Sequence, residues 1–299
     1  MKIAVYHRSV PIKNTNLEKP AILTNFGAGA QLCGDQVFDV QDQRRIDSDV
    51  GVIQGWTHGT PGKGHLQLRQ DVIANTPYTV AADSNLFLYK NTANPGNYLR
   101  YSFNGIFPTT GIYCDDKVDP GRWNQISQDL GLALKDYRTT GNHILLCLQR
   151  NGGWSMGGIS VVDWAAQTIA TLRQYTDRPV VVRAHPGDRG SLKYLSGSKW
   201  TVSNDGRSLE DDLRNCWAVV NYNSSPVVGA AIEGYPIFVT DPARSQCREI
   251  ANTDLSQIEN PKMPDRLPWA QRISMFHWNF EDLRSGCCWR HMRQYVSAR

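Results

Sequence analysis

The stretch Val180-Val181-Val182-Arg183-Ala184-His185-Pro186 reads as a buried strand that ends in polar residues. A second apolar run, Ala218 to Tyr222, leads in the same way into Asn223-Ser224-Ser225 and then into a short helix at 227–233. Strands alternate with helices along both halves of the chain, which indicates α/β architecture with parallel sheets covered on both faces. Ligands of such sheets bind beyond the carboxyl ends of the strands. These two strand ends are therefore where we expect a site.

The residue types at the two strand ends suit an anionic ligand. Ser224 and Ser225 offer hydroxyls and backbone N–H groups at the start of a helix. Arg183 and His185 would supply charge and directional hydrogen bonds from the neighbouring strand. Taken singly, Ser224 would simply cap its helix and His185 would be a core histidine. Taken together on adjacent strand ends, they favour an anion site.

Working outward from this region, the chain divides into two β/α halves. A polar stretch at 137–142 is the expected linker, which gives an N-terminal domain at 1–136 and a C-terminal domain at 143–270. Residues 91–123 show no clear periodicity and are expected to form loops, with a hairpin as the alternative. The last segment, 271–299, is expected to be helical.

Composition narrows the class of protein. With 299 residues, 40% of them hydrophobic, and a net charge of +4, the chain is neither disordered nor collagenous. No apolar stretch approaches the roughly 20 residues of a membrane span, and no apolar leader follows Met1, so we expect a cytoplasmic protein without membrane insertion. The seven cysteines contain no C-x-x-C pair and indicate neither a disulfide framework nor a zinc cluster.

From about 140 to 245 the sequence resembles the donor-binding half of GT-B glycosyltransferases. It is most similar to the branch that holds bacterial capsule-polysaccharide and glycerophosphate transferases. The shared features are the strand ending in His185-Pro186, the turn Ser224-Ser225, and the small-residue helix before Gly234-Tyr235-Pro236. The resemblance implies two Rossmann-like domains with parallel sheets facing a central cleft, and a C-terminal helix that crosses back onto the first domain.

The resemblance also implies roles for individual residues. The second domain would hold a nucleotide-sugar donor, with UDP-sugar expected as co-substrate and no further cofactor or metal. The donor-binding residues would be Gln149, Arg183, His185, Asn223, Ser224 and Ser225. Many relatives carry a glutamate that contacts the donor ribose at the position of Gly229, and here Glu233 comes four residues later. The resemblance therefore leaves the nucleotide open.

Glycosyl transfer needs a base for the acceptor hydroxyl, and the first domain must supply it. Asp83, just after a predicted strand, is the first candidate, and its alternative is a turn residue. His58, in the glycine-rich loop at 55–65, is the second, and its alternative is a surface-loop histidine. Lys63 in the same loop is a candidate contact for an anionic group, although this loop is not a Walker A motif.

The C-terminal segment is basic and rich in tryptophan. Arg290 and Arg293 are candidate phosphate contacts, and their alternative is a solvated helix face. Helices are expected at about 268–275 and 280–295. Trp269, Trp278 and Trp289 are expected to be packing residues, and stacking on a base or sugar is their alternative. The adjacent carboxylates of Asp115 and Asp116 are candidate metal ligands, but a turn is the favoured interpretation.

The sequence thus predicts a metal-independent glycosyltransferase. The basic tail permits double-stranded DNA as the partner, with a hydroxymethylated pyrimidine as acceptor, as in phage-type enzymes that work in the host cytoplasm. A glycan or glycolipid acceptor is the alternative within the enzyme class. A non-catalytic nucleotide or nucleic-acid binding protein with the same fold is the alternative outside it.

Overall fold

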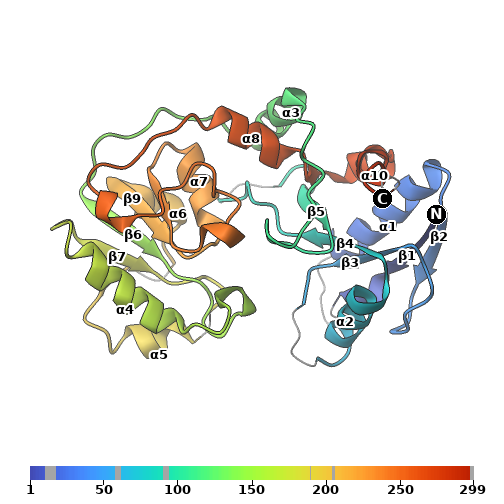
Figure 1. Ribbon diagram of the computed structural model, residues 1–299, viewed down its shortest axis with the longest axis horizontal. Coiled ribbons are helices and arrows are strands. Elements are labelled where there is room, and N and C mark those ends of the chain that lie inside the picture. The colour runs from blue at the N-terminus through green and yellow to red at the C-terminus, as the bar shows by residue number, and fades with distance from the viewer. Residues whose placement is uncertain (11–17, 58–61, 90–93, 189, 204–205, 297–299) are drawn as a thin grey trace. The chain divides into compact units, whose positions relative to one another are not determined.

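The structure is a computed structural model that describes the chain except for residues 11–17, 58–61, 90–93, 189, 204–205 and 297–299 (Figure 1). It divides into two compact units, each with its own sheet. Unit 1 comprises Met1–Asn85, Asn94–Gln125 and Gln271–Arg299, and unit 2 comprises Leu86–Ala93 and Ile126–Ala270. The stretch 137–142, expected as the linker, lies inside unit 2. The chain passes between the units within α3 (Pro120–Leu130) and within α8 (Leu267–Ser274).

The sheet of unit 1 has six strands in the order β11-β5-β4-β3-β1-β2. The strands are β1 Lys2–Tyr6, β2 Gln36–Val40, β3 Val50–Gln54, β4 Tyr78–Asp83, β5 Leu99–Phe103 and β11 His277–Trp278. The first four are parallel, whereas β5 and β11 run antiparallel to their neighbours. β5 falls within 91–123, where loops or a hairpin were expected; it pairs with β4 and with β11, which is far away in the sequence.

Alternate side chains of these strands face different helices. Val5 and Val52 pack in the cluster that includes residues of α1 (Glu18–Leu32), whereas Tyr6 and Ile53 pack with α2 (His65–Asn75). Trp289, in the C-terminal part of the chain, stacks edge-on against Phe26 of α1 with ring centroids 5.7 Å apart. The segment from 278 to 296 therefore completes the core on the α1 face.

The C-terminal helix expected at 280–295 is two helices, α9 (Phe280–Arg284) and α10 (Cys287–Arg293). Gly286 breaks them apart, because its φ of +78° is a left-handed conformation that most residues avoid. The three tryptophans of this region are buried, which confirms that they pack in the core.

The sheet of unit 2 has five parallel strands in the order β10-β9-β6-β7-β8. The strands are β6 His143–Cys147, β7 Val180–Arg183, β8 Thr201–Val202, β9 Cys216–Asn221 and β10 Ile237–Val239. The helices are α4 Val161–Leu172, α5 Ser191–Leu195, α6 Leu209–Leu213 and α7 Pro226–Ile232, with short 3-10 turns at Trp154–Met156 (η2), Pro242–Arg244 (η3) and Leu255–Gln257 (η4).

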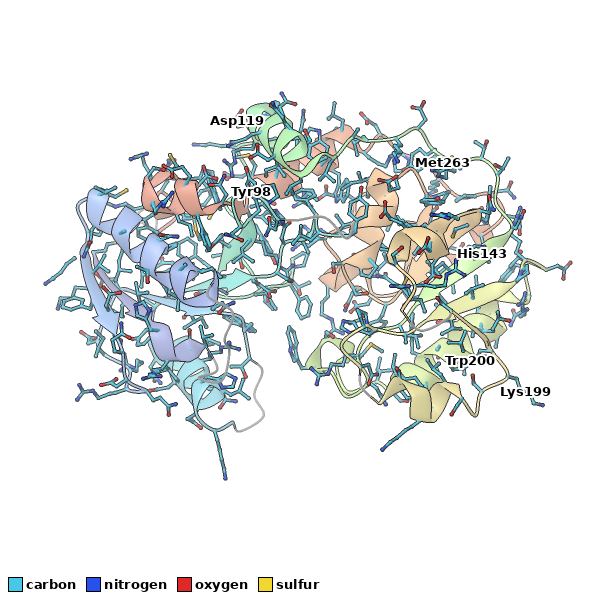
Figure 2. All side chains as sticks on the ribbon, turned by 180° about the vertical axis from the view of Figure 1, so that it is seen from behind. Tyr98, Asp119, His143, Lys199, Trp200 and Met263 are labelled. Atoms are coloured by element: carbon cyan, nitrogen blue, oxygen red, sulfur yellow. The ribbon has the colours of Figure 1, made fainter. Side chains whose placement is uncertain are left out.

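Helix α4 covers one face of this sheet. Trp164 of α4 packs with Leu146 of β6 and Val220 of β9, and Trp200, labelled in Figure 2, joins the same cluster. Helix α7 packs against β9 and β10. None of the helices in the described ranges has the length and apolar composition needed to cross a membrane.

Candidate functional site

The carboxyl edge of the unit 2 sheet, where its parallel strands end, contains a topological switch point. The chain leaves β6 through α4 toward β7 on one side, and leaves β9 through α7 toward β10 on the other. β6 and β9 are neighbours, and the point where the loops after two such strands lead to opposite sides is the usual ligand position in open α/β sheets. The two strand ends that the sequence singled out, after β7 and after β9, are not adjacent as expected, because β6 lies between them.

Hydrogen bonds join the loops on the two sides of this switch point. Gln149, just after β6, accepts from the backbone N–H of Asn223, just after β9, at 3.0 Å. The Gln149 amide also donates to the hydroxyl of Ser155 at 2.8 Å. Asn223 donates to the carboxylate of Asp241, after β10, at 2.8 Å. Gln149 and Asn223, both expected in the site, therefore form one buried network.

Arg244 brings a cation to this network that the sequence did not reveal. Its Nε lies 2.7 Å from Asp241, and its terminal nitrogens donate to the carbonyl of Ser155 at 3.3 Å and the hydroxyl of Tyr222 at 3.4 Å. These partners belong to the loops after β10, β6 and β9. The signal that could have found this arginine is its place directly after the strand at 236–240.

His185, after β7, is held as a neutral hydrogen-bond donor. Its Nδ1 accepts the backbone N–H of Gly187 at 2.9 Å, so a neutral ring must carry its proton on Nε2. Burial lowers the pKa of His185, and the nearby positive charge of Arg150 also lowers it, although Asp188 opposes them. The ring therefore stays neutral at pH 7 and offers an Nε2–H group.

Asp188 links the β7 loop to the β6 loop. Its carboxylate accepts the backbone N–H of Asn151 at 3.1 Å and the hydroxyl of Tyr194 at 2.7 Å. Burial alone would raise the pKa of Asp188, but these hydrogen bonds to its ionised form lower it overall. The charged carboxylate thus fixes the loop that carries His185.

The serine turn after β9 is shaped by Asn221, whose amide donates to the carbonyl and the hydroxyl of Ser224 at 2.7 and 3.0 Å. Ser225 precedes α7 and is exposed. Within the described part of the chain, it makes no side-chain capping bond to α7. Its hydroxyl is thus directed to neither of the helix N–H groups that a capping serine would satisfy.

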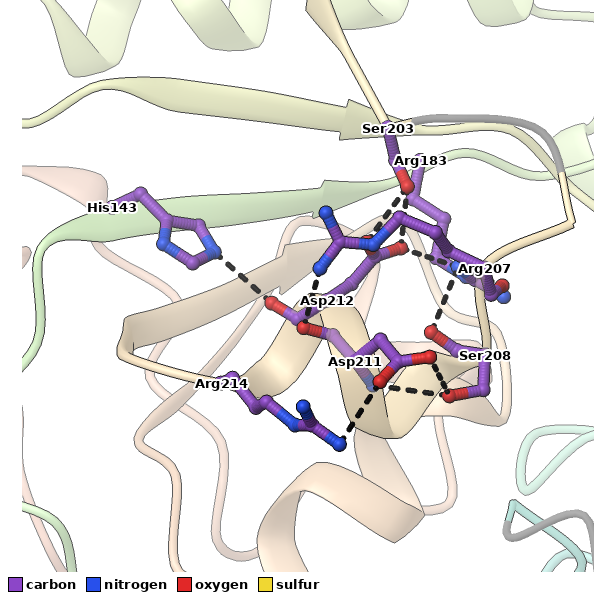
Figure 3. Close-up of polar contacts among 8 residues, drawn as sticks. All are labelled: His143, Arg183, Ser203, Arg207, Ser208, Asp211, Asp212 and Arg214. Atoms are coloured by element: carbon purple, nitrogen blue, oxygen red, sulfur yellow. Dashed lines mark hydrogen bonds and ion pairs between the residues drawn. The ribbon is translucent and has the colours of Figure 1, made fainter.

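Arg183 enters a different network, which Figure 3 shows. Its guanidinium forms an ion pair with Asp212 of α6 and donates to the carbonyl of Arg207 at 3.0 Å. The Asp212 side chain is only 2% exposed, and it also pairs with Arg207 at 3.3 Å and accepts from Ser203 at 2.7 Å. Sequence reasoning placed Arg183 on the donor diphosphate, but the structure gives it an internal partner on the β8–α6 side.

Gly229 and Glu233, the two positions raised by the resemblance, both meet Tyr89. A Cβ atom at Gly229 would lie 2.2 Å from Cγ of Tyr89, so the ring lies directly against α7. The Tyr89 hydroxyl donates to Glu233 at 2.8 Å, and Lys135 forms an ion pair with the same carboxylate. Glu233 is therefore engaged within unit 2.

In unit 1, Asp83 is the last residue of β4 and forms an ion pair with Arg100, its cross-strand neighbour in β5. Asp83 also acts on Arg69, whose pKa burial nevertheless lowers to about 10. His58 lies outside the described residues. Lys63 is exposed, two residues before the start of α2.

Arg290 and Arg293, the predicted phosphate contacts of the C-terminal segment, differ in their ion-pair partners. Arg290 is exposed on α10, whereas Arg293 pairs with the buried carboxylate of Asp35 at 3.3 Å. Asp115 pairs with Arg272 at 2.6 Å, and Asp116 accepts from the hydroxyl of Tyr295, so each carboxylate of the Asp-Asp pair has its own protein partner. Of the two predicted tail contacts, Arg290 is exposed, and Arg293, whose side chain is 39% exposed, has a buried ion-pair partner.

Sequence reasoning also missed His7, which follows β1. Its Nε2 lies 2.8 Å from a carboxylate oxygen of Asp39 in β2. The switch point of the unit 1 sheet lies between β1 and β3, so His7 follows a strand that borders it, and Asp39 lies on the β2 side of β1. A histidine oriented by a carboxylate is a common general-base arrangement, and the closeness of His7 to the first strand end could have suggested it.

Comparisons with known proteins add information about the fold. No family model matches the chain, and no curated protein matches it. The chain is similar to the solved structure of the β-Kdo 2,4 transferase of Thermosulfurimonas dismutans KpsC, with a TM-score of 0.57 and 13% identity over 93% of this chain and 92% of that one. It is also similar to the β-Kdo 2,7 transferase of the same KpsC, with a TM-score of 0.53 and 13% identity over 97% and 100%. The chain therefore has the α/β fold of these glycosyltransferases, as the sequence predicted.

Proposed function

We propose that the protein is a glycosyltransferase that moves a sugar from a nucleotide-sugar donor to an acceptor hydroxyl. The observation that carries this proposal is the switch point of unit 2, where Gln149, Asn223 and Arg244 are joined by hydrogen bonds and ion pairs. The fold of two known transferases supports the same reaction class. A crevice bordered by a cation and fixed amides suits a phosphorylated donor.

In the transfer, the acceptor oxygen forms a bond to the anomeric carbon while the bond from that carbon to the donor phosphate breaks. The leaving nucleotide takes the electron pair, so groups that stabilise its added charge speed the step. Nε2–H of His185, Arg244 and the hydroxyls of Ser224 and Ser225 are the groups we assign to the phosphates. With these donors we propose that transfer needs no metal. The donor is proposed to be a UDP-sugar, and nucleotide-activated Kdo is the second choice because both similar structures are Kdo transferases.

The acceptor proton must go to a base, which we assign to the carboxyl edge of unit 1. Asp83 keeps its place as a candidate, and its carboxylate forms an ion pair with Arg100. The His7–Asp39 pair is the second candidate, because Asp39 would stabilise the imidazolium that forms. Loss of turnover with unchanged donor binding in His7→Ala or Asp83→Asn would identify the base.

For the acceptor, we keep the proposal of a hydroxymethylated pyrimidine in double-stranded DNA, with a glycan or glycolipid as the alternative. Arg290 is the exposed tail residue on which the DNA proposal rests. Arg290→Gln should weaken DNA binding at low salt and reduce its salt dependence by about one phosphate contact. A protein that binds no DNA, or whose Arg290 variant binds it unchanged, favours a glycan acceptor.

The test of the donor site is a thermal-shift panel of UDP, CDP, CMP, GDP and their sugars. A nucleotide at 100 times its dissociation constant should stabilise the protein by about 2.7 kcal/mol. His185→Ala and Arg244→Gln should abolish the shift, and His185→Gln should keep part of it because it retains an N–H donor. Arg214→Gln is the matched control, because Arg214 is exposed and pairs only across one turn with Asp211.

The same panel, with an assay for released sugar, distinguishes a transferase from a non-catalytic nucleotide-binding protein. A selective shift together with slow release of free sugar from the donor would establish transfer chemistry. A selective shift without any release of sugar would support a non-catalytic nucleotide-binding protein. The absence of any nucleotide shift would refute the donor site.

A further inference from the structure

Arg69, in α2, joins the two loops that diverge at the switch point of the unit 1 sheet. This switch point lies between β1 and β3, because α1 leads from β1 to β2 on one side and α2 leads from β3 to β4 on the other. The Nε of Arg69 donates to the carbonyl of Ser9, after β1, at 2.9 Å, and its Nη1 donates to the carbonyl of Trp56, after β3, at 3.3 Å. The guanidinium therefore lies where an open α/β sheet usually binds its ligand.

The backbone around the guanidinium is fitted to it. Gly55, the first residue after β3, has a left-handed φ of +75°, and a Cβ atom there would lie 3.0 Å from Nη1 and 3.1 Å from Cζ of Arg69. Ser9 is buried, and its hydroxyl accepts the backbone N–H of Gln54 at 3.1 Å, which ties the end of β3 to the turn after β1. Contacts with the main chain of two loops therefore hold the cation in place.

This cation has no counter-charge of its own. Arg69 forms no ion pair within the described ranges, and three of its five N–H groups find no acceptor there. Asp83, whose charge acts on Arg69, forms its ion pair with Arg100 instead. Burial lowers the pKa of Arg69 to about 10, so the guanidinium stays charged at pH 7. A half-buried cation that keeps N–H groups available is well suited to an anionic ligand.

We propose that Arg69 binds an anionic group of the acceptor, a phosphate or a carboxylate carried near the hydroxyl that receives the sugar. This inference rests on the proposed function, because it needs the acceptor at the carboxyl edge of unit 1. His7 follows β1 and Asp83 ends β4, so both candidate bases belong to the same edge of the sheet as Arg69. A flipped nucleotide would supply its own 5′-phosphate, and an acidic glycan would supply the carboxylate of a sugar acid.

The experiment measures the affinity of paired probes by ligand-observed NMR, in the absence of any donor. Hydroxymethyl-dCMP is compared with hydroxymethyldeoxycytidine, and glucuronate with glucose, so that each pair differs by one anionic group. The wild type should prefer the charged member of one pair by roughly 10- to 100-fold, because its hydrogen bonds to Arg69 are charge-assisted. Arg69→Gln should remove this preference, and Arg69→Lys should keep part of it because the charge remains. Arg44→Gln is the matched control, because Arg44 is 79% exposed in the loop after β2, at the same edge of the sheet.

A loss in Arg69→Gln that is confined to the charged member of a pair would establish the anion site, and the pair that shows it would name the source of the anion. An equal loss for the charged and the neutral member would overturn the proposal, since Arg69 would then only hold the two loops together. A wild type that prefers neither charged probe would overturn it as well. If Arg69→Gln does not fold, Arg69→Lys decides, because an unchanged preference in that variant would also overturn the proposal. Discrimination between the probes by a protein that binds no nucleotide would refute the donor site and leave the anion site of unit 1.

Discussion

Replacing Asp212 by asparagine tests whether the network in Figure 3 stabilises unit 2. The Asp212 carboxylate is 2% exposed, and it is the counter-charge of Arg183, which is 19% exposed. Removing one partner of a buried ion pair costs about 3–5 kcal/mol, because the other charge stays buried without compensation. Arg207 is 45% exposed, so water screens its ion pair with Asp212 and the loss of that pair adds little. In the variant, Arg183 still donates to the backbone carbonyl of Arg207. We therefore expect Asp212→Asn to lose about 3 kcal/mol of unfolding free energy, at the lower end of the range.

For a domain of the size of unit 2, this loss should lower the unfolding temperature by roughly 6–12 °C. Circular dichroism melts would measure it, and hydrogen exchange should show faster exchange in α6 and β9 than in the strands of unit 1. Asp211→Asn is the matched control on the same helix, because its carboxylate pairs with the exposed Arg214. An Asp212→Asn protein that melts within a degree of wild type would refute the reasoning.

Arg183→Gln extends the test to function. If Arg183 is a structural cation, the variant should melt at a lower temperature and still bind the donor nucleotide with wild-type affinity below its transition. A variant of unchanged stability that loses nucleotide binding would instead make Arg183 a donor ligand, as the sequence alone suggested.

Two further predictions concern buried groups. Burial lowers the pKa of His277 to about 3, below its unfolded value near 6.5, so unfolding takes up a proton between these values. The contribution of neutral His277 to the free energy of unfolding should be fully present above about pH 6.5 and should fall by up to about 1.4 kcal/mol per pH unit below it. Thermal melts from pH 7 to 4 would measure this dependence, and His277→Gln should make it flatter. Gly229→Ala should destabilise unit 2 by about 1–3 kcal/mol, because its Cβ would meet the Tyr89 ring. Urea denaturation of the single and double variants with Tyr89→Ala should show non-additive losses, and additive losses would mean that the ring does not pack there.

The sequence predicted those features of the site that follow from strand order. Parallel strands end at one edge of their sheet, so the alternation of strands and helices places the polar residues after β7 and β9 at that edge. It does not give the strand order, and β6 lies between these two strands. Gln149, after β6, was expected in the site only through the resemblance. Gln149 and Asn223 do meet. Asp241 and Arg244 could not be placed from the sequence, because they lie in the loop after β10 and the path of that loop depends on tertiary packing.

Other features depended on contacts between distant residues. The pairing of Arg183 with Asp212 spans 29 residues and arises from the way α6 returns to the sheet, which no spacing rule encodes. The break at Gly286 had a local signal, a glycine inside an otherwise helical pattern, yet glycine within a helix costs only about 1 kcal/mol and does not by itself end one. Only the structure shows the left-handed φ of Gly286, which separates α9 from α10.

Arg183 and Arg244 show why a strand-end position alone does not identify a ligand-binding cation. Both follow parallel strands of one sheet, and both are paired with an aspartate. The partners of Arg183 lie in the segment between β8 and α6, whereas those of Arg244 lie in the loops after β6 and β9. Loops diverge at a switch point and leave room for a ligand, so the cation held by those loops is the one placed to meet a phosphate. We therefore propose Arg244 as the cation that meets the donor phosphate, and the Arg183→Gln variant tests whether Arg183 serves the fold instead.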